Sequence, residues 1–352
     1  MAVTSAEEHH DEQGRPSAWE AAWAVLAPVT DLVTPMAVRV AASLGLTDLM
    51  GGDTVPVEEL ARRSGADADA LGRLLRHLAC RGVFTEPEPG RFAVNGPAAL
   101  LASGHPSGMR VWLDLGGFGG QMDVAFTGLL HTVRTGRPAW ETVFGAPFWD
   151  YLAANPQMSA SFDATMAVGA DYVADAATGY DWSGARHVVD VGGGTGVLLA
   201  EVLRANPGIR ATLVDLPETV ERGRRYLAER GLDTRCEFAG QSFFDPLPAG
   251  GDVYVLRRVV HDWGDDDARL ILRRCADAAG RHGRVVMIES RGAGDDPAMF
   301  AEMNLRMLVL SGGRERTAED YAALAARAGL DVAAVHSTAL GHLILDCTPL
   351  GP

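Results

Sequence analysis

The chain has 352 residues, 47% of them hydrophobic, and at roughly 100 to 200 residues per domain this length predicts two domains or one large one with ample core. Its 46 acidic and 31 basic residues give a formal net charge of -15, which opposes binding to the phosphate backbone of nucleic acids. These values exclude a disordered or fibrous protein and argue against general nucleic-acid binding.

The N-terminal residues do not resemble a signal peptide. Residues 1–17 are polar and acidic, with neither a basic start nor an apolar segment, so we expect a disordered tail over residues 1–18. The best apolar stretch, 21–33, is shorter than the roughly 18 residues of a spanning helix and is broken by Pro28 and Asp31, which predicts no membrane span. The cysteines are too scattered for a CxxC metal site or a disulfide framework, so a reduced, cytoplasmic protein is expected. They are Cys80, Cys236, Cys275 and Cys347.

Residues 19–105 are predicted to form one helical domain with a hairpin. Residues 19–50 are helical in composition and very apolar, so they need a partner surface. A short amphipathic helix begins near Val57, and a stronger one ends before Gly82. A turn at 86–90 and a return strand at 91–94 complete the pattern, which is typical of a winged helix.

Residues 106–180 contain helix-forming stretches interrupted by glycines, and they are predicted to form a helical connector and the wall of a pocket. From residue 181 onward, short β-branched runs alternate with helical ones, which predicts an α/β domain with a doubly wound sheet over 181–352. The predicted strands are 187–191, 211–215, 252–256, 284–289, 330–335 and 342–347. The predicted helices are 197–205, 217–230, 266–279 and 317–328, the last with a capping-box variant at its start.

A glycine turn follows the first of these strands, at 190–196 (DVGGGTG). Val197 occupies the third glycine position of the dinucleotide fingerprint GxGxxG, so that fingerprint fails, whereas DxGxGxG fits. Such glycines allow close approach of the backbone to a single carboxylate or to adenosine. Asp215 ends the second strand about 20 residues later, where a carboxylate can accept both ribose hydroxyls. The pair predicts adenosine binding; a plain tight turn, with Asp215 as a helix N-cap, is the structural alternative.

Two further groups follow the same logic. Phe243 lies where the chain would pass the adenine, so its ring either stacks on the base or packs in the core. His261 lies beyond the end of strand 252–256, and Glu289 ends strand 284–289. Because the carboxyl ends of parallel strands meet at one edge, these two residues should lie in the same cleft as the glycine turn.

The histidine suits the role of a general base, since flanking acids fix its tautomer and stabilise the imidazolium. Glu289 can provide one such carboxylate, whereas Glu315, immediately before the last long helix, would by itself be a solvated charge. Deprotonating a phenol (pKa about 10) with an unperturbed histidine (about 6.5) is uphill by about 3.5 pKa units, or about 5 kcal/mol. Two carboxylates offset much of that difference, whereas the gap to an aliphatic alcohol is far larger. A phenol is therefore the favoured substrate; a capping or packing role for His261 is the alternative.

Taken together, these motifs resemble the S-adenosylmethionine-dependent small-molecule O-methyltransferases, which include plant phenolic enzymes and bacterial aromatic polyketide tailoring enzymes. The resemblance spans nearly the whole chain. Its motifs are VVDVGGGTG (188–196), LVDLP (213–217), SFFDPLP (242–248), VVHDWGDDDA (259–268) and GGRERT (312–317). It implies a Rossmann-like catalytic domain, S-adenosylmethionine as cofactor without a metal, and a homodimer formed through an intertwined N-terminal winged-helix domain.

The resemblance also implies roles for individual residues. His261 would be the base, with Glu289 and Glu315 beside it. The implied cofactor contacts are Asp190, Gly192, Gly193, Gly194, Asp215, Leu216, Ser242, Phe243 and Arg257. Two positions depart from the family pattern: Gln241-Ser242 replaces the usual Gly-Asp, and Arg257 stands where many members have Lys. A weaker or water-mediated adenine contact is expected at the first of them.

The acceptor pocket is less defined. Candidate substrate-binding residues are Trp112, Phe148, Phe162, Met166, Asn304 and Met307. All of them suit core packing equally well except Asn304, a polar residue in an apolar helical run that can hydrogen-bond a substrate. An aromatic carboxylate would favour an arginine in the pocket. Residues 18–37 contain none, which favours a neutral phenol.

Two other functions remain open. The same fold hosts hydroxylation or decarboxylation in polyketide pathways, although an intact His261 with its two glutamates argues against this. The winged helix also permits a DNA-binding regulator, with Arg73 and Arg76 on its second helix, but the net charge opposes it.

Overall fold

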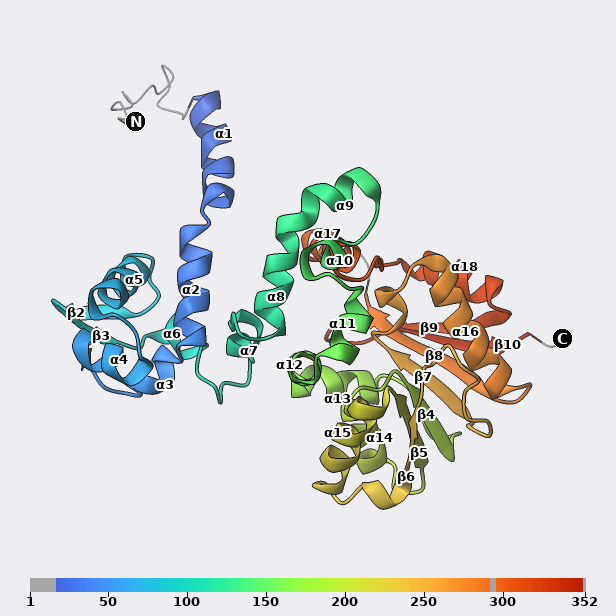
Figure 1. Cartoon of the computed structure of the whole chain (residues 1–352). Coiled ribbons are helices and arrows are strands. Elements are labelled where there is room, and N and C mark those ends of the chain that lie inside the picture. The colour runs from blue at the N-terminus through green and yellow to red at the C-terminus, as the bar shows by residue number, and fades with distance from the viewer. Residues whose placement is uncertain (1–16, 292–295, 351–352) are drawn as a thin grey trace. The chain divides into compact units, whose positions relative to one another are not determined.

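The computed structural model describes residues 17–291 and 296–350, so the predicted tail lies almost wholly outside the described residues. The chain divides into two compact units (Figure 1). The first ends at His105 and includes Leu113–Leu115, and the second comprises Pro106–Trp112 and the chain from Gly116 onward.

The first unit is a helical domain with a small sheet. Its helices are α1 (Ala18–Leu26), η1 (Ala27–Thr30), α2 (Val33–Ser43), α3 (Leu46–Met50), α4 (Val57–Ser64), α5 (Ala68–Cys80) and α6 (Gly96–Ala99). Its strands β1 (Val55–Pro56), β2 (Thr85–Glu88) and β3 (Arg91–Ala93) pair antiparallel in the order β1-β3-β2. Leu60, Leu75, Leu78 and Phe92 are fully buried between the helices and this sheet. The predicted succession of two helices and a hairpin is therefore present.

The predicted turn at 86–90 is too long. Strand β2 continues to Glu88 despite Pro87, and the chain turns at Pro89 and Gly90. A proline is compatible with β2 because this strand lies at the edge of the sheet, where one side needs no hydrogen-bond donors.

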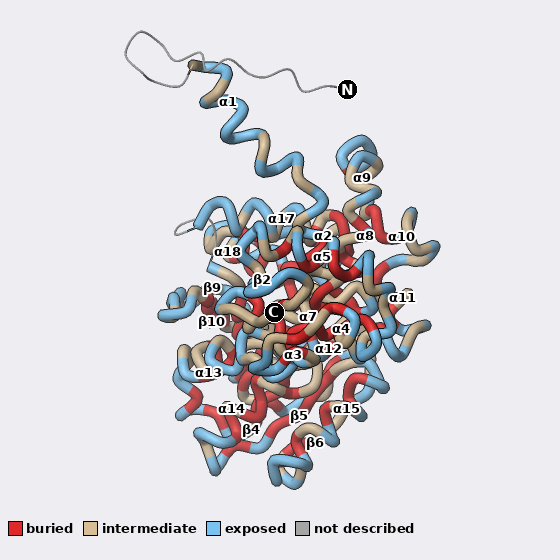
Figure 2. Tube along the Cα trace, turned by 90° about the vertical axis from the view of Figure 1, so that its left-hand side faces the viewer, coloured by how far each residue is buried: buried red, intermediate tan, exposed pale blue. Residues whose placement is uncertain are grey.

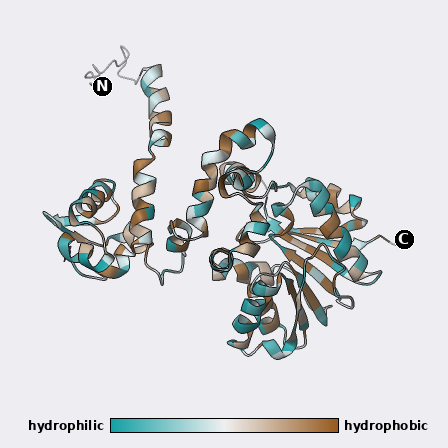
Figure 3. Cartoon of the chain, in the orientation of Figure 1, coloured by the Kyte–Doolittle hydropathy of each residue, from teal (hydrophilic) through white to brown (hydrophobic). Residues whose placement is uncertain are grey.

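The N-terminal helices present apolar side chains to the surface (Figures 2 and 3). Trp19 is 66% exposed and Trp23 50%, and their rings stack at 6.0 Å. By length and composition alone, the stretch Ala18–Ser43 could cross a membrane, and only 6% of an 18-residue window within it is buried, which differs from the expectation of no such stretch. In the structure Asp31 and Leu32 lie outside any helix, so α1 and α2 are separate helices.

The second unit begins with a layer of short helices around an aromatic core. They are α7 (Met109–Leu113), α8 (Phe118–Ala125), η2 (Phe126–Gly128), α9 (Leu129–Thr135), α10 (Ala139–Phe144), α11 (Phe148–Ala154), α12 (Pro156–Met166) and α13 (Ala170–Thr178). Phe118 contacts the rings of Trp140, Phe148 and Phe162 at 5.0 to 6.4 Å. α17 (Pro297–Leu310) adds Met307 and Leu310 to this cluster.

A seven-stranded sheet follows, in the order β6-β5-β4-β7-β8-β10-β9. The strands are β4 (His187–Val191), β5 (Arg210–Asp215), β6 (Cys236–Gly240), β7 (Val253–Arg257), β8 (Arg284–Ser290), β9 (Leu330–Ser337) and β10 (His342–Pro349). All are parallel except β10, which pairs antiparallel with β8 and β9. The predicted α/β class with a doubly wound sheet is confirmed. Edge strand β6 was not predicted, because most of it is not buried and it therefore lacks an apolar run.

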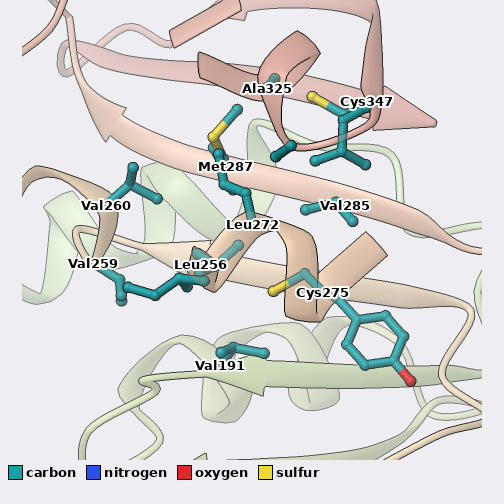
Figure 4. Close-up of a cluster of buried hydrophobic side chains, with 14 of the residues drawn as sticks. Val191, Leu256, Val259, Val260, Leu272, Cys275, Val285, Met287, Ala325 and Cys347 are labelled. Atoms are coloured by element: carbon teal, nitrogen blue, oxygen red, sulfur yellow. The ribbon is translucent and has the colours of Figure 1, made fainter. Parts of the chain in front are cut away.

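Helices cover both faces of this sheet. They are α14 (Val197–Ala205), α15 (Pro217–Ala228), α16 (Asp265–Ala279) and α18 (Ala318–Arg327), with short turns η3 (Asp233–Arg235) and η4 (Val260–Asp262). Buried residues of α13 and α14 pack on one face, and those of α16 and α18 on the other. Val259 and Val260, which directly precede His261, belong to the same buried cluster as α16 and α18 (Figure 4). The histidine is thus attached to the core through its neighbours.

Candidate active site

Four parallel strands place polar groups at one edge of the sheet. β4 carries Asp190 and β5 ends at Asp215, while η4 after β7 carries His261 and β8 carries Glu289. These strands are neighbours in the order β5-β4-β7-β8, so the predicted gathering at the carboxyl edge is what the topology produces.

The glycine turn leaves room for a ligand only because it lacks side chains. Gly192 and Gly194 adopt φ of 69° and 59°, a region that favours glycine. A β-carbon on Gly193 would stand 2.6 Å from Asp190 Cγ, and one on Gly192 would stand 2.8 Å from Val259 Cγ2. Neighbouring side chains therefore already occupy the space behind the turn, and its open side consists of backbone.

Asp215 is tied to this turn. Its Oδ2 accepts the Gly194 N–H at 2.8 Å and its Oδ1 accepts the Leu216 N–H at 2.7 Å. Burial raises the pKa of Asp215 to about 6, while the two backbone donors lower it. Leu216 is the N-cap of α15 and no side chain caps that helix, so the alternative role of Asp215 as a helix cap does not describe this contact.

Asp190 lies directly against the turn. Its side chain is almost fully buried, and neither carboxylate oxygen has a hydrogen-bond partner among the described residues. Burial raises the pKa of Asp190 to about 7, and the positive charge of Arg257 opposes that rise. Burial likewise lowers the pKa of Arg257 to about 10, and its Nε lacks a partner within the described part of the chain. These two side chains retain hydrogen-bonding capacity for a polar ligand.

Aromatic rings also lie next to the turn, at Gly192. The Phe243 ring would lie 3.4 Å from a β-carbon on Gly192, and it meets the Trp263 ring edge-on at 5.8 Å. The Ser242 hydroxyl accepts a backbone N–H of its own loop, and the Gln241 amide donates to the Pro246 carbonyl. Gln241 and Ser242 thus hydrogen-bond within their own loop, and Trp263 lies beside it as a further aromatic neighbour, one that was not predicted from the sequence.

The histidine is held between two carboxylates. His261 is buried, with Nδ1 2.7 Å from Glu315 Oε1 and Nε2 3.5 Å from Asp262 Oδ1. Glu289 Oε1 instead accepts the Val260 N–H at 2.9 Å. Glu289 therefore acts on the histidine through its charge and through the backbone before it, and Asp262 takes the place beside Nε2. Asp262 could have been found from the sequence, because it directly follows His261 in the motif at 259–268.

Charge dominates this cluster. Burial lowers the pKa of His261, but three carboxylates outweigh it and raise the value to about 9. They belong to Asp262, Glu289 and Glu315. Burial raises the pKa of Glu289 to about 7. Burial also works to raise the pKa of Glu315, yet its hydrogen bond with His261 brings the net value below the ordinary one.

The segment 311–316 is docked on the histidine loop. Arg314 N–H donates to the His261 carbonyl at 2.9 Å, and the Ser311 hydroxyl donates to the Asp262 carbonyl at 2.7 Å. A β-carbon on Gly313 would stand 2.2 Å from the His261 carbonyl oxygen, so only glycine fits there. The buried guanidinium of Arg316 donates to two more carbonyls of this loop and pairs with Asp265 at 2.8 Å. These contacts explain how the segment 312–317 (GGRERT) holds Glu315 beside His261.

The predicted acceptor residues fall into two groups. Five belong to or pack against the aromatic cluster: Trp112, Phe148, Phe162, Met166 and Met307. Asn304 lies elsewhere, and its Oδ1 accepts the Glu315 N–H at 3.1 Å. It also lines a surface cavity of about 530 Å³ between one face of α17, the start of α16 and residues 312–314. Asn304 thus supports the acid beside the base.

No group of three or more His, Cys, Asp or Glu side chains within residues 17–291 and 296–350 is arranged to hold a metal ion.

Known protein families and proteins match most of the chain. A family model described as an O-methyltransferase domain matches residues 126–331, and one described as an O-methyltransferase dimerisation domain matches residues 29–103. The chain is 44% identical to the 2,7-dihydroxy-5-methyl-1-naphthoate 7-O-methyltransferase of Streptomyces carzinostaticus, over 88% of this chain and 93% of that protein. It is 43% identical to the aclacinomycin 10-hydroxylase RdmB of Streptomyces purpurascens, over 90% of this chain and 86% of that protein.

A solved structure gives the same picture. It is the O-methyltransferase NcsB1 from neocarzinostatin biosynthesis in complex with S-adenosylmethionine and 2-hydroxy-5-methyl naphthoic acid. It matches with a TM-score of 0.86 and 41% identity, over 92% of this chain and 98% of that one.

Proposed function

The chain belongs to the O-methyltransferase family, and from that premise we propose that it methylates a phenolic hydroxyl of an aromatic natural product, with His261 as the general base. One observation carries the proposal: Glu315 holds Nδ1 of the buried His261, which leaves Nε2 to face an acceptor hydroxyl. S-adenosylmethionine supplies the methyl group when it is bound.

The residues around the glycine turn suit this cofactor. The turn offers open backbone, Asp215 lies at the end of β5 for the ribose hydroxyls, and Phe243 lies beside the turn for the adenine. Asp190 and Arg257 retain unpartnered polar atoms for the charged amino-acid end. The remaining implied contacts, at Gly193, Gly194, Leu216 and Ser242, lie in the same turn and loops.

The charge around His261 fits a phenolic acceptor. A base with a pKa of about 9 differs from a phenol by only about 1 pKa unit, or about 1.4 kcal/mol, compared with about 5 kcal/mol for an unperturbed histidine. An aliphatic alcohol would remain far out of reach. His261 therefore removes the proton while the cleft orients the oxygen toward the methyl group.

The acceptor class follows from the relatives. One of them is a methyltransferase of a dihydroxynaphthoate, and the solved structure is a complex with a naphthoic acid. Both favour a fused aromatic acceptor for this chain. A neutral phenol, expected from the lack of arginine in residues 18–37, stays a prediction. The six predicted pocket residues likewise stay candidates for acceptor contacts.

A second function deserves one test because a 43% identical relative is a hydroxylase. Titration with S-adenosylhomocysteine, followed by a methyl-transfer screen, separates the two. The screen contains hydroxynaphthoates, hydroxynaphthalenes and anthracycline aglycones. Micromolar one-to-one binding with a methylated product supports methyl transfer. Binding without product in the whole screen would contradict it and favour the non-methylating alternative.

We further propose a metal-free reaction, a cytoplasmic location and a homodimer through the first unit, without nucleic-acid or membrane binding. The exposed apolar surface of α1 and the match to a dimerisation domain support the dimer. Replacement of Trp19 and Trp23 by serine should convert a dimer to a monomer in light scattering.

Full activity in excess EDTA is expected; loss of activity that Mg²⁺ restores would contradict the metal-free reaction. Co-sedimentation of the wild type with lipid vesicles would contradict the soluble dimer.

A further inference from the structure

Asp262 occupies the position next to the reactive nitrogen of His261. Since Glu315 binds Nδ1, the acceptor proton must arrive at Nε2, and the Asp262 carboxylate lies 3.5 Å from that atom. The Asp262 side chain is 20% exposed, whereas those of His261 and Glu315 are 4% and 1% exposed. Of these three groups, Asp262 is therefore the one in contact with solvent.

A general base must lose its proton before each new turnover, and the other acids are badly placed to take it. Glu315 is bound to the opposite nitrogen, where it stabilises the imidazolium. Glu289 is fully buried, and one of its oxygens accepts the Val260 N–H. Neither offers a route from Nε2 to water.

We propose that Asp262 takes the proton from His261 Nε2 in each turnover and passes it to solvent water, a role that rests on the proposed function. In the first step the phenolic O–H bond breaks, the oxygen keeps the electron pair and an N–H bond forms at Nε2. In the second step this N–H bond breaks and an O–H bond forms at Asp262 Oδ1. In the third step the proton leaves Asp262 for water, so His261 and Asp262 return to their starting states.

The electrostatic surroundings suit a transient carrier. Burial raises the pKa of Asp262, which makes its carboxylate a better proton acceptor than an exposed one, although His261 and Arg258 oppose that rise. The other charged or titratable groups around the pair are Glu289, Glu315, Arg316 and Tyr321. Asp262 is also the more exposed of the two side chains, so a proton that reaches it can leave for solvent water.

A purely structural role can be separated from this one. The loop is fixed through the Asp262 backbone, whose carbonyl accepts the Ser311 hydroxyl and whose N–H donates to the Val259 carbonyl. Asp262→Asn keeps these contacts and nearly the same volume while it removes the charge. Asp266, on the exposed first turn of α16, provides the matched control Asp266→Asn.

The first experiment titrates His261 by NMR in the full-length protein without an acceptor. We expect the midpoint of His261 to fall by at least one pH unit in Asp262→Asn and to stay unchanged in Asp266→Asn. Asp262→Glu, which retains a carboxylate, should keep the midpoint within half a unit of the wild type. An unchanged midpoint in a folded Asp262→Asn variant would overturn the proposal.

The second experiment tests proton transfer during turnover. At pH 10, where His261 is neutral in both proteins, Asp262→Ala should lower kcat at least tenfold, and added imidazole or formate should restore it in a saturating manner. Wild type and Asp266→Asn should not respond to these small carriers. An unchanged kcat, or a loss that no carrier restores, would overturn the proposal. If the wild type methylates no acceptor at all, the proposed function fails, and the NMR titration still decides the Asp262–His261 pairing.

Discussion

The glycine turn and the histidine cluster lie at the same edge of the sheet, yet they are built in different ways. At the turn, one acid, Asp215, is held by backbone N–H groups of Gly194 and Leu216. At the cluster, His261 is held by a side chain 54 residues away, on a segment that is itself docked by Ser311 and Arg316. Asp215 is therefore fixed by backbone N–H groups, and His261 by long-range contacts between side chains.

The sharpest separation of the two regions is His261→Gln. The variant should lower kcat by about 10² to 10⁴, because general-base catalysis contributes on that order, while the affinity for S-adenosylhomocysteine stays within about twofold. Steady-state kinetics and calorimetry on one preparation measure both. His336→Gln, on the exposed surface of β9, is the control. Near-normal turnover of His261→Gln would remove the base assignment.

A pH series should affect the two properties of the cluster in opposite directions. Because the pKa of His261 is about 9, only about 1% of it is neutral at pH 7, so kcat should rise about tenfold per pH unit and level off above pH 9. The folded-state pKa lies above the unfolded value of 6.5. The stability that His261 contributes is thus fully present below about pH 6.5 and is lost as the pH rises through 9.

Burial raises the pKa values of Glu289 and Asp190 to about 7. Deprotonation of these two acids therefore also lowers the stability as the pH rises. Urea melts between pH 6 and 10 measure the stability, and initial rates at saturating cofactor measure kcat. A rate that is flat between pH 7 and 9 would contradict the raised pKa of His261.

The turn is tested by Asp215→Ala. The variant should weaken binding of S-adenosylhomocysteine about 10- to 50-fold, because it removes the ribose contact and leaves the Gly194 and Leu216 N–H groups without this acceptor. At saturating cofactor, kcat should stay within about threefold of the wild type, since His261 is untouched. Calorimetry gives the affinity; a large loss of kcat with unchanged affinity would reverse the roles of the two regions.

The smallest expected effect concerns packing behind the turn. Gly193→Ala places a β-carbon 2.6 Å from Asp190 Cγ and should lower the free energy of unfolding by about 1–3 kcal/mol. Gly208→Ala meets nothing within 4 Å and is the matched control, with a change of about 0.5 kcal/mol or less. Urea denaturation compares the two. Equal stabilities would mean that the backbone moves to accommodate the β-carbon.

The sheet shows which elements a pattern can predict. Buried central strands such as β4 and β8 are continuous apolar runs, and both were expected within one residue of their bounds. β6 and β2 are edge strands with polar or proline residues, so apolar periodicity predicts neither, and only pairing with β5 and β3 makes them strands.

The local features of this protein could be predicted from its amino-acid sequence. The glycine turn, the acid that ends β5 and the capping box at Thr317 each join residues that are adjacent in the chain or follow a strand directly, so their spacing carries the information. The strand order also predicted His261 and Glu289 at one edge of the sheet, and the family resemblance added Glu315 to them.

Which of these acids bonds which atom depends on the three-dimensional fold. Glu315 takes Nδ1, Glu289 takes the Val260 N–H, and Asp262 lies by Nε2. Asn304 supports the Glu315 backbone, and its expected contact with the substrate stays a prediction. The physical reason is that the distances among side chains from β7, β8 and the segment before α18 depend on how the strands and helices pack, and residue types in sequence do not record it.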